Sequence, residues 1–250
     1  MPFGNTGRKS VNDPPVETVS KREIQTGKID DDRVYSFEYI FDCDELLRVY
    51  NDLVSTPDNV AENRWPEQSR ISVGWGEVDV QQYKAGHPSS INNYPYIKEL
   101  IEEFSTDITA VKWFRDKPHF AYAIHYDHAS RMQRPQLTPR QVMHTMPHFT
   151  EEEANRYIEW RLHGTKTALA VLLKGHSPIE FTHENQRDWP EALWSKGSKD
   201  YRYKYKSALL NTQWTHYTTG DDVHERLMFR FSFFDRSFED TKTVFKNKGL

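Results

Sequence analysis

Apolar residues recur with helical spacing in two segments of the first half of the chain. Residues 44–54 and 95–104 each place an apolar side chain every three or four positions, which gathers those side chains on one face of a helix. Two further helix starts follow. Thr138-Pro139 sets a capping hydroxyl before a first-turn proline, and Thr150 with Glu153 forms a capping box. The pattern therefore predicts four helices.

The second half of the chain is mainly strand-like. Short runs of β-branched, aromatic and aliphatic residues are separated by turn residues. The predicted strands cover 34–41, 71–80 (interrupted by Gly74 and Gly76), 120–126, 167–173, 179–182, 207–217 and 226–234. Because the helices lie early or within one insertion, this order favours a mainly β fold with flanking helices, a jelly-roll-type double sheet, over an alternating α/β sheet.

Composition divides the chain into an arm and one domain. Residues 1–33 are polar and carry few large apolar groups, so we expect a flexible arm. The chain is 14% aromatic, and aromatic side chains bury large areas. We therefore expect residues 34–250 to fold as a single domain, with a helical insertion at about 138–163.

Charge and composition exclude several classes of protein. The formal net charge of −4 gives no basic surplus for phosphate binding, so we expect no nucleic-acid partner. The longest apolar run, Ala168–Leu173, has six residues, too few to span a membrane. The single cysteine, Cys43, excludes a disulfide framework and a cysteine-rich zinc site. No signal-peptide pattern occurs, so a cytoplasmic location is the default expectation.

The first candidate site lies in Ala121-Tyr122-Ala123-Ile124-His125-Tyr126-Asp127. Side chains alternate across a strand, so His125 and Asp127 share one face with two alanines that leave space in front of them. An imidazole and a carboxylate in this arrangement can bind one metal ion and leave it open to a third ligand. The alternative is an aspartate that hydrogen-bonds to the histidine with no metal.

The second candidate site combines His216 with the strand that follows it. In residues 226–234, alternation puts Arg230 and Ser232 on the face opposite a row of large apolar side chains. A buried arginine is costly unless its charge is paired. Its planar fork matches a carboxylate, and the Ser232 hydroxyl could add a donor. A ligand carboxylate and an internal ion pair to a distant acid fit this pattern equally well.

Taken in order, His125-x-Asp127, His216 and Arg230-x-Ser232 resemble the motifs of the iron(II)/2-oxoglutarate-dependent dioxygenase superfamily, over roughly residues 115–235. Two histidines and one carboxylate form the facial triad that holds iron(II) and leaves coordination positions open. The resemblance implies a double-stranded β-helix, a jelly roll or cupin-like barrel. It also implies iron on His125, Asp127 and His216, the carboxylate of 2-oxoglutarate on Arg230 and Ser232, and no catalytic residue beyond the metal centre.

The activity implied by the resemblance is that of an oxidoreductase, with O2 and 2-oxoglutarate as co-substrates and hydroxylation of a C–H bond as the outcome. The carboxylate of Asp127 argues against halogenation. The substrate would be a small molecule, an amino acid or a peptide, and the sequence leaves its identity and the oligomeric state open. Two alternatives are a cupin-type metal enzyme that does not use 2-oxoglutarate and a non-catalytic jelly-roll binding protein.

Other residues compete for these roles on weaker grounds. His224 lies in an expected turn close to Arg230. Arg226 shares the face of Arg230, but it lies at the polar entrance of the strand and has no serine two positions on. We expect the remaining histidines to be surface or packing residues, including His128, His144, His148, His176 and His183.

Overall fold

The computed structural model describes residues 31–37, 39–56, 60–61, 70–119, 124, 126–127, 137–175, 179–182, 184–194, 201–202, 207–218 and 225–250. Its helices are α1 (Cys43–Ser55), α2 (Glu77–Lys84), α3 (Pro95–Phe104), α4 (Pro139–Thr145), α5 (Glu151–His163) and α6 (Phe238–Asn247), with the 3₁₀ helices η3 (Ser90–Asn93) and η5 (Glu191–Leu193). Its strands are β1 (Val34–Tyr35), β2 (Val60–Ala61), β3 (Arg70–Trp75), β4 (Thr109–Asp116), β5 (Thr167–Lys174), β6 (Ile179–Phe181), β7 (Tyr201–Arg202), β8 (Ser207–Asn211), β9 (His216–Thr218) and β10 (Arg226–Phe233). None of these helices has the length and apolar character needed to cross a bilayer.

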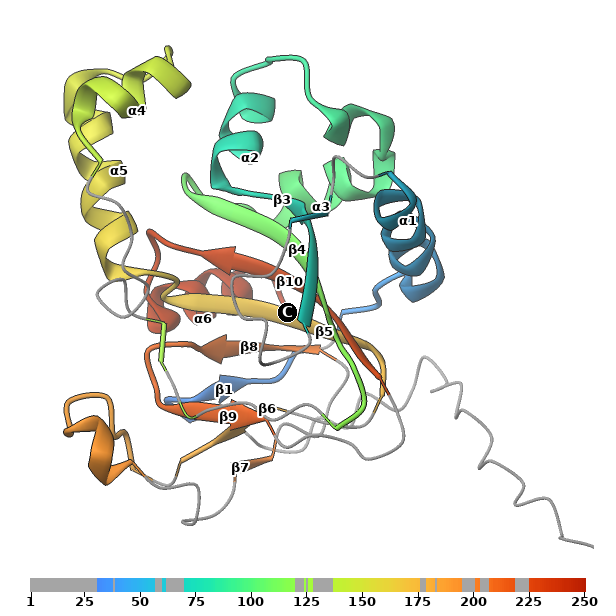
Figure 1. Ribbon diagram of the computed structural model, residues 1–250, viewed down its shortest axis with the longest axis vertical. Helices are drawn as coiled ribbons and strands as arrows, with labels where there is room; N and C mark the ends of the chain where they lie inside the picture. The colour runs from blue at the N-terminus through green and yellow to red at the C-terminus, as the bar shows by residue number, and fades with distance from the viewer. Residues whose placement is uncertain are drawn as a thin grey trace, which may run out of the picture.

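Seven strands form one large sheet in the order β1-β8-β5-β10-β4-β3-β2, and each of its pairings is antiparallel. β10 lies at the centre of the sheet between β5 and β4 (Figure 1). Three shorter strands, in the order β7-β6-β9, form a second antiparallel sheet. The mainly β fold with flanking helices is confirmed, and an alternating α/β sheet is excluded for the described residues.

The alternation along β10 divides the large sheet into an outer and an inner face. On the outer face, Leu227, Phe229, Phe231 and Phe233 are buried in a core shared with side chains of α1, α3 and α6. Figure 1 shows α1 and α3 together on one side of the large sheet. Full burial of one such side chain contributes about 1.5–3 kcal/mol, so this layer is the main source of stability for the sheet.

The inner face of the large sheet packs against the small sheet. Ala170, Ala208 and Met228 of the large sheet are buried in one cluster with Ile179 and Phe181 of the small sheet. The two sheets therefore face each other with a shared apolar layer, an arrangement consistent with a jelly roll. Arg226, Arg230 and Ser232 point to this inner side, since they alternate with the outer-face residues.

Helices α4 and α5 form a hairpin over one end of the inner face. Tyr157 of α5 packs in one buried cluster with Ala110 of β4 and Phe234, which follows β10. Burial raises the pKa of Tyr157, and its hydroxyl donates to the carboxylate of Glu77 on α2 at 3.3 Å. Because Ala110 lies opposite Ser232, the hairpin borders the end of the inner face at which Ser232 is placed.

Most predicted elements are confirmed with shifts of one or two residues at their ends. The capping signals at Thr138 and Thr150 do begin helices, and each closes a capping box. The confirmed predictions are the helices at 44–54 and 95–104 and the strands at 167–173, 179–182 and 226–234.

Three strand predictions need correction. The strand expected at 34–41 is confined to Val34–Tyr35, the two residues that pair with β8. The strand expected at 71–80 ends at Trp75, because Gly76 is the N-cap of α2. The strand expected at 207–217 is two strands, β8 and β9, which belong to different sheets. Five of the seven residues predicted as a strand at 120–126, including His125, lie outside the described residues, and Ile124 and Tyr126 belong to no strand.

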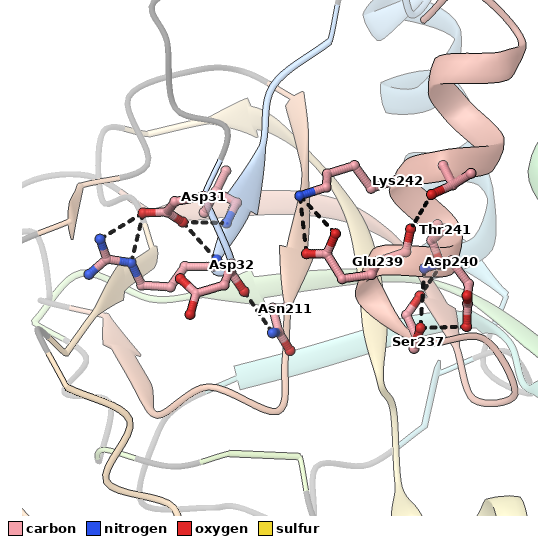
Figure 2. Close-up of polar contacts among 11 residues, drawn as sticks. Asp31, Asp32, Asn211, Ser237, Glu239, Asp240, Thr241 and Lys242 are labelled. Carbon is pink, nitrogen blue, oxygen red and sulfur yellow. Dashed lines mark hydrogen bonds and ion pairs between the residues drawn. The ribbon is translucent and has the colours of Figure 1, made fainter.

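Residues 31–33 already contact the large sheet. Asn211 of β8 donates its side-chain amide to the carbonyl of Asp32 at 2.7 Å, and its backbone N–H donates to the carbonyl of Arg33 at 2.8 Å. Figure 2 shows the Asn211–Asp32 contact beside the capped start of α6, where the N–H of Asp240 donates to Ser237 Oγ at 3.1 Å. The arm predicted over residues 1–33 otherwise lies outside the described residues.

Candidate functional site

Four of the five predicted site residues are described, and they come from three parts of the fold. Arg230 and Ser232 lie on the inner face of β10, and His216 is the first residue of β9. Asp127 lies in the connection between β4 and α4. His125 lies outside the described residues.

The backbone of Asp127 is bound to the turn that joins β8 to β9. Its N–H donates to the carbonyl of Thr212 at 2.9 Å, and its carbonyl accepts from Gln213 Nε2 at 2.7 Å. The same Gln213 nitrogen donates to the carbonyl of Thr165 at 2.6 Å. Since this turn leads directly into His216, these hydrogen bonds fix the backbone of Asp127 relative to the start of β9.

The same turn is held on its other side by the segment that follows β6. The N–H of Thr182 donates to the carbonyl of Thr215 at 3.1 Å, and the N–H of Gln186 donates to the Thr215 hydroxyl at 2.9 Å. The indole of Trp214 donates to the carbonyl of Thr182 at 2.9 Å. Residues 212–215 therefore satisfy their polar groups outside a strand ladder, and the chain passes here from the large sheet to the small one.

The side chain of His216 is oriented by a backbone carbonyl. His216 is buried on the same face of the small sheet as Phe181, its partner on β6, with 5.7 Å between the ring centroids. Its Nδ1 lies 2.7 Å from the carbonyl oxygen of Trp214. Because a carbonyl only accepts, Nδ1 carries the proton, and in the neutral ring Nε2 then carries the lone pair. This is the tautomer of a metal-binding histidine whose second nitrogen donates to a carbonyl.

Arg230 and Asp127 form an ion pair with Nη2 and Oδ2 2.7 Å apart, and both side chains are largely buried. The internal ion pair considered for Arg230 is therefore present, and its acid is the predicted metal ligand. Arg230 keeps further donors. Its Nε is buried and has no hydrogen-bond partner among the described residues. Leaving a buried donor unsatisfied costs about 1–3 kcal/mol, so an acceptor placed there by a ligand would be favoured.

Short side chains lie opposite Arg230 and Ser232 on β5, and opposite Ser232 on β4 as well. Ala170 lies opposite Arg230, and Ala168 and Ala110 lie opposite Ser232 on β5 and β4. All three alanines are buried. Within the sheet, the neighbours of Ser232 therefore place nothing longer than a methyl group beside its hydroxyl.

Arg226 departs from the position expected for it. It does not lie at a polar entrance, since its side chain is 2% exposed and Nη1 pairs with Asp116 Oδ2 at 3.2 Å. Asp116 lies directly opposite Arg226 on β4, a strand that the sequence analysis did not predict. The charge of Arg226 is therefore compensated by an acid that belongs to neither predicted motif, whereas the acid that pairs with Arg230 is the predicted metal ligand Asp127.

The competing histidines do not form a second site in the described part of the chain. His144 lies in α4 and His148 beyond its end, so the two do not share a helical face. Among the described residues, no three His, Cys, Asp or Glu side chains gather to hold a metal. His125 lies outside the described residues, as do the competing histidines His128, His176, His183 and His224.

Sequence reasoning missed two residues of this region, Gln213 and Lys112. Gln213 clamps Asp127, but it lies in a segment that was interpreted as one strand, and only the polar run Asn211-Thr212-Gln213 indicated a turn. Lys112 lies directly opposite Arg230 on β4. The β-branched and aromatic residues of 109–116 could have indicated this strand, but its partner could not have been found from the sequence.

No family model matches the chain, and no curated protein matches it. Among solved structures, it is similar to HygX from Streptomyces hygroscopicus with nickel and 2-oxoglutarate bound, at 8% sequence identity and a TM-score of 0.39, over 79% of this chain and 81% of that one. It is similar to a Pseudomonas putida prolyl-4-hydroxylase at 11% identity and a TM-score of 0.36, over 79% and 89%. It is also similar to vicilin from hazelnut (Corylus avellana) at 8% identity and a TM-score of 0.33, over 76% and 35%. The proposed function rests on the side chains of this chain.

Proposed function

We propose that this chain is a non-haem iron(II)- and 2-oxoglutarate-dependent oxygenase that hydroxylates a C–H bond of an organic substrate. The observation that carries the proposal is the contact between Asp127 and Arg230, whose side chains meet at 2.7 Å although 103 positions separate them in the sequence. One residue belongs to the motif expected for metal binding and the other to the motif expected for carboxylate binding. A structural protein with accidental motifs has no reason to bring these two together.

His125, Asp127 and His216 are the residues that would hold the metal. The tautomer of His216 set by the Trp214 carbonyl fits ligation through Nε2. The ion pair with Arg230 is compatible with ligation by Asp127, because a carboxylate can bind a metal through one oxygen while the other accepts a hydrogen bond. The bound iron(II) would supply activation of O2, coupled to oxidative decarboxylation of 2-oxoglutarate.

Arg230 and Ser232 would bind the carboxylate of 2-oxoglutarate that is remote from the metal. The buried Nε of Arg230 is a donor that needs an acceptor, and Ser232 adds a hydroxyl two positions along the same face. Arg230 then touches both Asp127 and the co-substrate, so it orients the co-substrate relative to the metal ligands. The apolar cluster between the two sheets would exclude water from this region.

The two facing sheets would form the double-stranded β-helix that such a site requires, with the α4–α5 hairpin at one end. We propose a small molecule, an amino acid or a peptide as the substrate. The cupin-type alternative also needs a metal, but it gives no role to the unsatisfied Nε of Arg230. A non-catalytic jelly-roll binding protein gives no role to a metal site or to the unsatisfied Nε of Arg230.

Binding measurements on the purified protein test the proposal. The wild-type protein should bind one Fe(II), or redox-inert Zn(II), and bind 2-oxoglutarate when the metal is present. His125→Ala, Asp127→Asn and His216→Ala should each nearly abolish metal binding while the circular dichroism of the folded chain is retained. His144→Ala, on the hairpin, is the matched control and should bind metal normally.

Arg230→Lys separates the metal site from the co-substrate site. This variant keeps the positive charge beside Asp127 but loses the planar guanidinium group, so 2-oxoglutarate affinity should fall while metal affinity changes little. Metal binding without 2-oxoglutarate binding in the wild type would favour the cupin-type alternative. Binding of neither would favour the non-catalytic one, and metal retained in all three ligand variants would refute the assigned ligands.

A further inference from the structure

Asp31, Asp32 and Arg33 form a tight turn immediately before β1. The Asp31 carboxylate accepts from the backbone N–H of Arg33 at 2.7 Å, and it pairs with the guanidinium Nη2 of the same residue, also at 2.7 Å. The N–H of Asp31 donates to the carbonyl of Val34 at 3.3 Å. These contacts are local, so the turn by itself sets the direction of the Arg33 side chain.

Asn211 joins this turn to the large sheet. The register of β1 and β8 ends with Val34 opposite Leu210, so Asn211 lies one position beyond the ladder. Its backbone N–H donates to the carbonyl of Arg33 at 2.8 Å. Its side-chain Nδ2 donates to the carbonyl of Asp32 at 2.7 Å (Figure 2). Both donors of Asn211 therefore hold the turn that precedes β1.

The two oxygens of Asn211 accept from residues that contact the proposed metal ligands. Oδ1 accepts from the N–H of Gln213 at 3.1 Å, and the backbone carbonyl accepts from the N–H of Trp214 at 3.2 Å. Gln213 in turn donates to the carbonyl of Asp127, and the carbonyl of Trp214 accepts from Nδ1 of His216. Asn211 is therefore one hydrogen bond away from each residue that orients a ligand.

The side chain of Trp214 is held from two directions. Its indole N–H donates to the carbonyl of Thr182 at 2.9 Å, and the guanidinium carbon of Arg33 lies 5.5 Å from the centre of its ring. A cation at this distance is attracted to the negative face of an indole. Because Asp31 binds the same guanidinium, Arg33 is already in place when it meets the ring. The indole cannot rotate without losing a contact, which restrains the backbone of Trp214 as well.

We propose that the turn at 31–33 and Asn211 form a clasp that positions the proposed metal ligands Asp127 and His216. This inference rests on the proposed function, and it gives a role to the last three residues of the segment expected to be a flexible arm. The clasp acts through its contacts with the turn between β8 and β9. Residues that hold metal ligands in place typically contribute about ten- to one-hundred-fold to metal affinity. Loss of the clasp should therefore weaken metal binding while the pairing of β1 with β8 remains.

Calorimetry of Zn(II) binding to full-length variants tests the clasp. Asn211→Ala removes the side-chain contacts to Asp32 and Gln213, and it should weaken Zn(II) binding about ten-fold. Arg33→Met keeps the length of the side chain but removes the cation beside Trp214. It should weaken Zn(II) binding about three-fold, as expected for loss of one partly exposed cation–π contact.

Arg156→Met is the matched control for Arg33→Met. The guanidinium carbon of Arg156 lies 5.6 Å from the ring centre of Trp160, and both residues belong to α5. The control variant therefore removes the same type of contact at nearly the same distance, but outside the clasp. It should leave Zn(II) affinity unchanged.

A measurement on the metal-free chain separates positioning from stability. When the histidines are labelled with nitrogen-15, NMR follows the Nδ1 proton of His216, identified by its absence in His216→Ala. This proton should exchange slowly with water in the wild type, because the carbonyl of Trp214 holds it, and several-fold faster in Asn211→Ala. Urea denaturation of the same variants gives the loss of stability separately.

The outcomes distinguish this inference from the proposed function. If stability falls in Asn211→Ala and Arg33→Met but Zn(II) affinity and proton exchange do not change, the clasp only stabilises the fold, and the inference is overturned while the proposed function stands. If Asn211→Ala does not fold, Arg33→Met carries the test, since it changes a partly exposed side chain. Absence of Zn(II) binding in the wild type overturns the proposed function and this inference with it.

Discussion

The buried ion pair between Arg226 and Asp116 should be the most sensitive polar contact of the large sheet. Its side chains are 2% and 1% exposed, and the two residues lie opposite each other where β10 begins and β4 ends. Replacing Arg226 with Met keeps the length of the side chain but leaves the Asp116 carboxylate buried without its guanidinium. Removing one partner of such a pair costs about 3–5 kcal/mol, because the remaining charge is still desolvated.

This cost is large against the total stability of a domain, which is about 5–15 kcal/mol. For a chain of this size, each kcal/mol lowers Tm by roughly 2–4 °C, so Arg226→Met should lower Tm by about 6–20 °C. Urea denaturation followed by circular dichroism gives the free energy of unfolding directly. The double variant Arg226→Met/Asp116→Leu should recover most of the loss, since it leaves no buried charge.

Arg115→Met is the matched control for the assay. Arg115 of β4 pairs with Glu225 at 2.7 Å, a shorter distance than the 3.2 Å between Arg226 and Asp116, but its two side chains are 37% and 33% exposed. Water screens this pair, so its removal should cost less than about 1 kcal/mol. Equal losses in Arg115→Met and Arg226→Met would refute the argument from burial. A double variant no more stable than Arg226→Met would show that Asp116 has other essential roles.

Three further predictions concern a glycine in β3, the hydrogen bond that holds Asp127, and the residues before Asp31. Gly74→Ala should destabilise the chain by more than about 2 kcal/mol in urea denaturation, because Gly74 has a φ of +130° and a Cβ there would lie 2.4 Å from the Val111 carbonyl oxygen. Gly86→Ala is the control and should cost less, since Gly86 also has a positive φ but a Cβ there would meet no atom within 4 Å. Gln213→Met should weaken Zn(II) binding several-fold in calorimetry, because the carbonyl of Asp127 loses its clamp, and unchanged affinity would show that the clamp does not position this ligand. A chain that starts at Asp31 should fold and should decarboxylate 2-oxoglutarate at the full-length rate when no prime substrate is present, since no site residue is assigned to residues 1–30. Insolubility or loss of turnover in the shortened chain would contradict this.

The sequence by itself determined the elements whose signals are local. The capping boxes at Thr138 and Thr150 were visible because cap and partner lie three positions apart. The alternation of 226–234 correctly separated the outer face, with Phe229 and Phe231, from the inner face, with Arg230. These properties depend only on backbone period, which residues close in sequence share.

The break at 212–215 shows what the sequence could not determine. Residues 207–217 have the composition of one strand, yet the hydrogen bonds of Gln213 and Thr215 go to Asp127 and to the segment after β6. Those partners lie about thirty or more positions away, so no local pattern reports them. The passage from the large sheet to the small one, which places His216, was therefore decided by tertiary contacts.

The same distinction between local and tertiary information applies to the candidate site. The sequence supplied the residue types of the metal and carboxylate motifs, because an ordered set of histidine, aspartate and arginine is visible in a single chain. Only the tertiary structure decided that Arg230 meets Asp127, that Lys112 lies opposite Arg230, and that Arg226 is neutralised by Asp116. Each of these pairings follows from which strand lies beside β10 and in which register, and strand neighbours are chosen by the burial of whole faces between distant segments.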